Sequence, residues 1–161
     1  MIRAIAAIDK NRGLGAKNDL LFNIKADMLH FRTYTAKGIV VVGYNTLLSF
    51  PNQKPLPGRT TICLCPPEIN RTDCFCVHTF DECLALVKEL AKTQDVWIIG
   101  GGMLYTSMLP YCDNLELTHI DAEGDAEVFF PDYTQDFEPS AVDVWETENG
   151  IRYRFVSYRR K

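Results

Sequence analysis

The sequence has no excess of basic residues and no long apolar run. Its 17 Lys and Arg residues are outnumbered by 21 Asp and Glu residues, which gives a net charge of −4. A chain of this charge is poorly suited to holding nucleic acid phosphates. The first apolar run is interrupted by Arg3 and closed by Asp9, so it is too short and too charged for a signal peptide or a membrane span. We therefore expect a cytoplasmic protein whose partners include neither nucleic acid nor a membrane.

The signatures of several common catalytic sites are missing as well. The chain has only three histidines, and His30, His78 and His119 do not have the spacing of metal ligands. No serine or cysteine lies in a nucleophile elbow, and there is neither a P-loop nor a G-x-G-x-x-G motif. The sequence therefore supports neither acyl transfer nor metal-dependent chemistry, and no metal site is predicted.

The six cysteines are expected to be reduced thiols in a cytoplasmic protein. Four of them, Cys63, Cys65, Cys74 and Cys76, occupy alternate positions of two strand-like runs, where cysteine packs as a small apolar residue. A structural zinc is the less favoured alternative, because one-residue spacings without a histidine pair fit the usual ligand patterns poorly.

Length and hydrophobic pattern predict one α/β domain spanning residues 1–161. The chain is 47% hydrophobic and has no internal repeat, and a domain of this size buries roughly 70% of its unfolded surface. A long polar loop is expected at 9–23 and a hairpin turn at Asn149-Gly150. Helices are expected at 25–36, 45–50, 79–92 and 104–109, and strands at 2–8, 39–43, 60–65, 74–78, 95–99, 115–120, 141–147 and 151–158. This order predicts a mixed, mostly parallel central sheet of about eight strands, about four flanking helices and a C-terminal antiparallel hairpin.

Three consecutive glycines, Gly100 to Gly102, join a buried strand to a short helix. At such a junction α/β folds bind anionic ligands through free backbone N–H groups and the helix dipole. A pyrophosphate site is one interpretation, and a purely structural tight turn is an equally weighted alternative.

Two charged residues also invite two interpretations each. Asp27 lies early in a helix, on the same face as Ile24, Phe31 and Tyr34. It is either a first-turn acid that favours the helix dipole or a partly desolvated carboxylate that receives paired N–H donors from a flat ligand. Arg59 follows a Pro-Gly turn, and it is either a solvated turn residue or a clamp for a carboxylate.

The order of the motifs resolves these alternatives through a resemblance. The segments "IAAID", "GLGAKNDLLFNIKADMLHF", "VVVGYNT", "PLPGR", "IIGGGMLY", "LTHIDAEGD" and "FPDY" resemble those of bacterial dihydrofolate reductases from end to end. The resemblance implies reduction of 7,8-dihydrofolate to 5,6,7,8-tetrahydrofolate by NADPH, with hydride transfer to C6 and protonation at N5. It also implies a role in one-carbon and thymidylate metabolism, antifolate binding in the same pocket, and a monomer.

The same resemblance implies roles for individual residues. Asp27 would bind the pterin, Arg59 would clamp the glutamate carboxylate, and Gly101-Gly102 would carry the family's cis peptide. The predicted catalytic set is Asp27, Leu20 and Phe22. The predicted substrate-binding set is Ile5, Asp27, Phe31, Phe50, Leu56, Arg59, Ile99 and Thr118. The predicted cofactor-binding set is Ala7, Leu14, Gly15, Asn18, Gly43, Tyr44, Thr46, Cys65, Gly101, Gly102 and Tyr105.

Four residues depart from the family's pattern. Phe22 stands where many relatives have a tryptophan, and Tyr44 stands where an arginine commonly meets the 2′-phosphate of the cofactor. Pro66 and Met103 replace a hydroxyl and a basic residue. The preference for NADPH over NADH is therefore predicted to be weaker than usual, with Arg71 or His78 as compensating groups. Two other hypotheses stay open: a pterin or pyrimidine reductase of the same fold, and a non-catalytic nucleotide-binding module.

Overall fold

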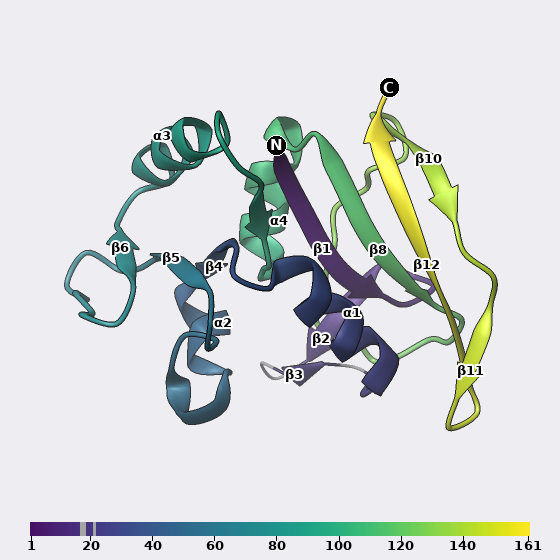
Figure 1. The fold of residues 1–161 in the computed structure, drawn as a ribbon. Helices are drawn as coiled ribbons and strands as arrows, with labels where there is room; N and C mark the ends of the chain where they lie inside the picture. Colours follow the sequence, from purple (N-terminus) through teal and green to yellow (C-terminus); the bar gives the residue numbers. More distant parts are fainter. Residues whose placement is uncertain (17–18, 21) are drawn as a thin grey trace.

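The protein is built on one large mixed sheet (Figure 1). The computed structural model describes the backbone of residues 1–16, 19–20 and 22–161 and the side chains of residues 1–15 and 22–161. Along the sheet the strands follow the order β10-β12-β8-β1-β7-β4-β5-β6, and β11 pairs with β12 beside β10. The strands of this sheet are β1 (Ile2–Ile8), β4 (Ile39–Gly43), β5 (Thr60–Leu64), β6 (Phe75–Val77), β7 (Val96–Ile98), β8 (Asn114–Ile120), β10 (Phe137–Val142), β11 (Glu146–Glu148) and β12 (Ile151–Arg160).

The strands from β8 to β6 are parallel to one another, and β12 joins β8 in the antiparallel sense. The helices are α1 (Lys25–Thr35), α2 (Tyr44–Leu48), α3 (Phe80–Leu90) and α4 (Gly102–Met108), with 3₁₀ turns η1 (Pro51–Gln53) and η2 (Leu109–Tyr111). The predicted α/β architecture is confirmed, including the hairpin turn, where Asn149 and Gly150 both have positive φ.

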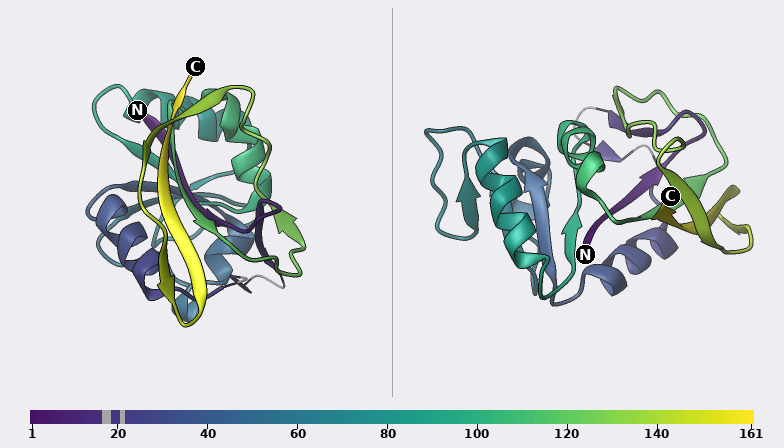
Figure 2. Two further views of the ribbon diagram at one scale, coloured as in Figure 1. Left: turned by 90° about the vertical axis from the view of Figure 1, so that its right-hand side faces the viewer. Right: turned by 90° about the horizontal axis from the view of Figure 1, so that it is seen from above.

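Helices cover both faces of the sheet, with α1 and α4 on opposite sides (Figure 2). Adjacent strand residues point to opposite faces, so each central strand contributes to two apolar clusters. One cluster joins α3 and α4 to the sheet and includes Val41, Ile62, Ile98, Val87, Leu104 and Met108. The other lies on the side of α1 and α2 and includes Ile5, Val40, Val42, Leu47, Cys63, Cys65, Trp97 and Ile99. Cys63 and Cys65 therefore pack as core residues, as predicted.

The prediction of an irregular loop over residues 9–23 is wrong in part. The segment contains β2 (Gly13–Ala16) and β3 (Asp19–Leu20), which form a small antiparallel sheet with β9 (Val128–Phe129). Asp9 is 4% exposed, and its carboxylate accepts N–H bonds from Asn11, Gly13 and Gly124. Gly124 is 115 residues from Asp9, so a local sequence pattern does not reveal this contact.

The predicted strand over residues 141–147 is two strands. β10 begins earlier, at Phe137, and stops at Val142, and β11 begins at Glu146. Between them Trp145 leaves the ladder and lies over the guanidinium groups of Arg152 and Arg154.

Among the described residues, no helix has the length and apolar character needed to cross a bilayer.

Candidate active site

A carboxylate and a hydroxyl meet between α1 and the sheet. Asp27 lies in the first turn of α1 and is partly buried. Thr118, on β8, donates its hydroxyl to Asp27 Oδ1 at 2.6 Å. Burial raises the pKa of Asp27, whereas the Thr118 hydrogen bond and the charge of His30 lower it. The result is a desolvated carboxylate whose Oδ1 is held and whose Oδ2 has no hydrogen-bond partner among the described residues, which is the environment that the functional interpretation of Asp27 requires.

The position of α1 is fixed by a residue that the sequence analysis missed. No local side chain caps the helix. Instead, the Glu148 carboxylate at the end of β11 accepts the N–H groups of Lys25 at 2.6 Å and Ala26 at 3.1 Å. A carboxylate at this end of a helix satisfies free N–H groups and favours the helix dipole. The C-terminal hairpin therefore anchors the turn of helix that carries Asp27.

The apolar residues predicted to bind the substrate come together on the same side of the sheet. Ile5 and Ile99 are buried. Phe31, Phe50 and Leu56 pack against the same cluster and stay partly exposed. We call these five residues the apolar wall. They come from β1, α1, the loops around η1 and the end of β7, which is the kind of convergent lining that a flat ligand needs.

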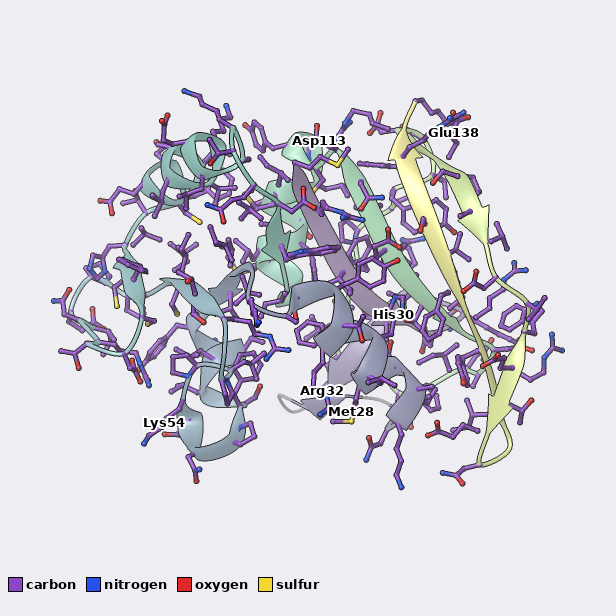
Figure 3. All side chains as sticks on the ribbon, viewed as in Figure 1. Met28, His30, Arg32, Lys54, Asp113 and Glu138 are labelled. Atoms are coloured by element: carbon purple, nitrogen blue, oxygen red, sulfur yellow. The ribbon has the colours of Figure 1, made fainter. Side chains whose placement is uncertain are left out.

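Arg59 stands beside the apolar wall, immediately before β5. Its Nε donates to Thr35 Oγ1 at 3.0 Å, its Nη1 donates to the Pro57 carbonyl at 2.7 Å, and its guanidinium lies 5.9 Å from the centre of the Phe31 ring. Burial and the nearby charge of Arg32 lower the pKa of Arg59. Arg59 is held in place by its two hydrogen bonds, and together with the charge of Arg32 nearby it favours an incoming carboxylate. Figure 3 shows Arg32 and Met28 along the lower edge of α1 and His30 on the side nearest β8 and β12.

The glycine corner, Gly100 to Gly102, lies where β7 ends and α4 begins. The cis peptide bond joins Gly100 to Gly101, so the prediction of a cis Gly101–Gly102 bond is wrong by one position. Gly102 is already the first residue of α4 and therefore belongs to regular helix. The carbonyl of Gly100 accepts the N–H of Gly43 at 2.8 Å, and this bond joins the ends of β4 and β7.

The glycine corner leaves no space for side chains. A Cβ on Gly101 would lie 2.8 Å from Thr46 Oγ1, and one on Gly102 would lie 2.5 Å from Val128 Cγ1. Gly100 has a φ of +110°, a conformation that favours glycine, and a Cβ on it would lie 3.0 Å from the Tyr105 ring. Packing within the protein is thus one reason for the glycines. Anion binding is a second reason that is compatible with the first. Both α2 and α4 begin at this edge without side-chain caps, which leaves N–H groups for an anion.

The comparisons with known proteins agree with this geometry. The family model described as dihydrofolate reductase matches residues 1–160. This chain belongs to the dihydrofolate reductase family. It is 33% identical to the type 3 dihydrofolate reductase of Salmonella typhimurium over 100% of this chain and 99% of that protein. It is 32% identical to the enzyme of Neisseria meningitidis serogroup B over 99% of this chain and 98% of that protein.

A solved structure gives the same result for the fold. Dihydrofolate reductase from Enterococcus faecalis, complexed with NADP(H) and RAB-propyl, superposes with a TM-score of 0.88 at 26% identity. The superposition covers 100% of this chain and 96% of that chain. The bacterial-type dihydrofolate reductase family and its fold, both predicted from the sequence, are confirmed.

Most residues predicted on the cofactor side lie along one edge of the sheet. The parallel strands end there together: Gly43 is the last residue of β4, Tyr44 and Thr46 follow it in α2, and Cys65 follows β5. Ala7 lies at the same end of β1, and Leu14 and Gly15 lie on β2. Asn18 and the side chain of Leu20 lie outside the described residues.

Two other predicted residues are engaged within the protein. Tyr105 is buried, and its hydroxyl donates to the Ile5 carbonyl at 2.7 Å. That hydroxyl holds α4 to β1, so contact with a cofactor would involve the ring. Phe22 packs against a small cluster that includes Ile24, Ile120 and Tyr153.

The two basic residues expected to compensate for Tyr44 are also engaged. Arg71 donates from Nε and Nη2 to the two carboxylate oxygens of Asp73, at 2.8 and 2.7 Å, and from Nη2 to the Gln53 carbonyl. His78 lies between the Pro66 carbonyl and Asn70 Oδ1, at 3.1 and 3.0 Å. Both residues stand near the ends of β5 and β6, and the charge of Arg71 is already balanced.

The described cysteines and acids do not form a metal site. Cys65 Sγ and Cys76 Sγ are 3.6 Å apart, and burial raises the pKa of the Cys74 thiol to about 12. Among the described residues, no group of three or more His, Cys, Asp or Glu side chains is placed to hold a metal ion.

Proposed function

We propose that this chain reduces 7,8-dihydrofolate to 5,6,7,8-tetrahydrofolate with NADPH and that Asp27 binds the pterin ring. The single observation that carries the residue assignment is the Asp27 carboxylate, held by Thr118 at 2.6 Å beside the apolar wall. The match to the dihydrofolate reductase family supports the assignment of the reaction. Asp27 would accept two parallel N–H bonds, from N3 and the 2-amino group of the pterin.

The pterin lies against the apolar wall with its polar edge toward Asp27. The negative charge of Asp27 favours the pterin protonated at N5 over the neutral form, because opposite charges in a partly desolvated site attract strongly. Arg59 holds the glutamate carboxylate of the tail, and these two polar ends fix the ring in one orientation. We assign Leu20 and Phe22 to the exclusion of bulk water from this site during the reaction.

The residues that would hold the cofactor are those of the glycine corner and of the ends of β4 and β5. The residues there fit a dinucleotide, because uncapped N–H groups open both α2 and α4 and the glycines keep the surface free of side chains. Gly43, Thr46, Gly101 and Gly102 would hold its phosphates and ribose, and Ala7 would contact the nicotinamide. When bound, the nicotinamide supplies the hydride for pterin C6.

The wider assignments follow from the same function. The chain acts as one domain and as a monomer in the cytoplasm, where it supplies one-carbon and thymidylate metabolism. Antifolates that present a 2,4-diamino edge occupy the pterin position and bind Asp27 by the same paired bonds.

A spectrophotometric assay tests the proposal. Adding dihydrofolate to the protein and NADPH should remove the near-ultraviolet absorbance of NADPH, and a diaminopyrimidine antifolate should stop the loss. A pyrimidine of the riboflavin pathway should cause no loss. Turnover of that pyrimidine without turnover of dihydrofolate would contradict the proposal and favour another reductase of this fold. Binding of NADPH without turnover of either substrate would favour a nucleotide-binding module.

A further inference from the structure

His30 lies one turn after Asp27 on α1 and is enclosed by aromatic rings. It stacks on Phe155 of β12 with ring centroids 3.9 Å apart and an interplanar angle of 9°. The Tyr34 ring covers it at 4.7 Å. Figure 3 shows His30 on the side of α1 nearest β8 and β12. The imidazole is therefore a packed component between the helix and the sheet.

The same two strands hold Asp27. In the antiparallel pair of β8 and β12, Phe155 lies directly opposite Thr118, so the two side chains project from the same face of the sheet. Thr118 bonds Asp27, and Phe155 stacks on His30. Two residues of α1 thus meet two neighbouring residues of the sheet, and a shift of His30 against Phe155 also shifts Asp27 against Thr118.

The charges that face His30 are mostly negative. Asp27 on its own helix, Glu116 on β8 and Asp143 after β10 all raise the pKa of His30, while burial lowers it more strongly. His30 Nε2 is buried and has no hydrogen-bond partner among the described residues. The imidazole is therefore neutral near pH 7 and becomes a cation in acid.

Of these three carboxylates, Asp27 is the one that His30 affects most. Glu116 already receives Arg3 at 3.0 Å and the Ser157 hydroxyl at 2.6 Å. The cation Arg154 lies opposite His119 in the pair of β8 and β12, so it projects from the other face of the sheet, where its guanidinium is 4.5 Å from the centre of the Trp145 ring. The neighbouring Tyr34 is a neutral phenol whose pKa is raised by burial.

We propose that His30 is a positioning residue for Asp27: its ring fixes α1 against β12, and its cationic form keeps Asp27 ionised in mild acid. The inference rests on the proposed function in that Asp27 is taken as the pterin-binding group. Its electrostatic part concerns the protein alone. Removing the cation leaves burial as the main influence on Asp27, so the carboxylate takes up its proton at higher pH.

The direct test is the titration of Asp27 without substrate. The ¹³C signal of its carboxyl carbon is assigned by its loss in Asp27→Asn and followed from neutral to acid pH by NMR. In His30→Phe, which keeps an aromatic ring on Phe155, the titration of Asp27 should move to higher pH. His119→Gln is the matched control, since His119 adjoins Thr118 but faces the other side of the sheet, 2.7 Å from the Tyr158 hydroxyl. A curve unchanged in His30→Phe, or shifted equally in His119→Gln, overturns the electrostatic part.

Kinetics test the positioning part. His30→Phe should keep kcat/KM for dihydrofolate near the parent value at pH 8, where His30 is neutral, and should lose activity at a higher pH than the parent as the solution is acidified. His30→Ala, which removes the ring, should lower kcat/KM for dihydrofolate several-fold both at pH 8 and in acid. Equal activity of the Phe and Ala variants at pH 8 would contradict the role of the ring. If the chain does not reduce dihydrofolate, the NMR titration still decides the electrostatic part, so the two failures are distinguishable.

Discussion

The substrate side and the cofactor side of the site are built in different ways. On the substrate side, Asp27 is held by Thr118 and its helix by Glu148, across separations of 91 and 122 residues. On the cofactor side, the glycine corner is a backbone feature, joined to β4 by the bond from Gly43 to Gly100. In the proposed function, the substrate would therefore be bound by side chains that can be exchanged singly. The cofactor would be bound by main-chain groups, which respond mainly to added atoms or charges.

The largest effect on the substrate side should come from Asp27→Asn. The amide keeps the shape and can still accept the Thr118 hydrogen bond, but it loses the charge that favours a protonated pterin. We expect kcat/KM for dihydrofolate at neutral pH to fall by between about 100-fold and 1,000-fold. Partial recovery is expected as the pH falls, because the substrate then arrives protonated. If Asp27→Asn were as active as the parent from pH 5 to 9, Asp27 would act only as a charge that favours the helix dipole.

The same substitution should stabilise the fold. Burial raises the pKa of Asp27 above its unfolded value, so the folded protein binds the proton more tightly than the unfolded chain. This contribution to stability is fully present below the unfolded pKa and is lost as the pH rises through the folded pKa. Asp27→Asn should therefore have a higher free energy of unfolding than the parent at pH 7, and the difference should shrink toward pH 4. Urea titrations at several pH values measure this difference in the free energy of unfolding. An Asp27→Asn variant less stable than the parent at pH 7 would contradict the effect of burial.

On the cofactor side, Gly101→Ala and Gly43→Ala separate two reasons for glycine. A Cβ on Gly101 would lie 2.8 Å from Thr46 Oγ1, whereas one on Gly43 meets its nearest atoms at an ordinary 3.8 Å. Gly101→Ala should lower both stability and NADPH affinity, by about 1–3 kcal/mol for the overpacking. Gly43→Ala should keep stability and lose NADPH affinity by about tenfold or more. Calorimetry measures the NADPH affinity and thermal unfolding measures the stability. Unchanged NADPH affinity in Gly43→Ala would contradict the placement of the cofactor at the end of β4.

Arg59→Ala tests the tail end of the substrate side. One charge-assisted contact to a carboxylate contributes about 1.5–3 kcal/mol. KM for dihydrofolate should accordingly rise by about tenfold or more. KM for a pterin without the glutamate tail should change little, which makes that substrate the internal control. Equal losses for both substrates would show that Arg59 acts only through Thr35 and Phe31, its contacts in the fold.

The two sides also differ in what the sequence predicts. The parallel strands, the helix expected at 79–92 and the Asn-Gly hairpin turn follow from local patterns, and the structure contains all three, the helix as α3. Asp27 and Arg59 stand out locally as an acid on an apolar face and a cation after a turn. Thr118, the partner of Asp27, comes from a distant part of the chain, and the roles of Asp27 and Arg59 are predicted from the order of the motifs.

The features missed are those that depend on tertiary contacts. Glu148 belongs to a hairpin turn in the sequence, and only the fold brings it to the start of α1. The strands within residues 9–23 exist because β2 pairs with β9, more than 100 residues away. His30 carries no signal in a single sequence, since its relation to Asp27 depends on Phe155 and Thr118.

The smallest expected effect concerns the choice between NADPH and NADH. Tyr44 begins α2 where a cation would meet the 2′-phosphate, and Arg71 nearby is paired with Asp73 at 2.7 Å. We expect a weak preference for NADPH in the parent, and an increase of about tenfold in Tyr44→Arg, since one charge-assisted bond contributes about 1.5–3 kcal/mol. Asp73→Asn should also increase the preference, because it releases Arg71 from its counter-ion, whereas Asp81→Asn, on the exposed first turn of α3, should not. Values of kcat/KM for both cofactors decide the matter: a strong parental preference that neither Tyr44→Arg nor Asp73→Asn changes would mean that the 2′-phosphate is bound away from this end of β4.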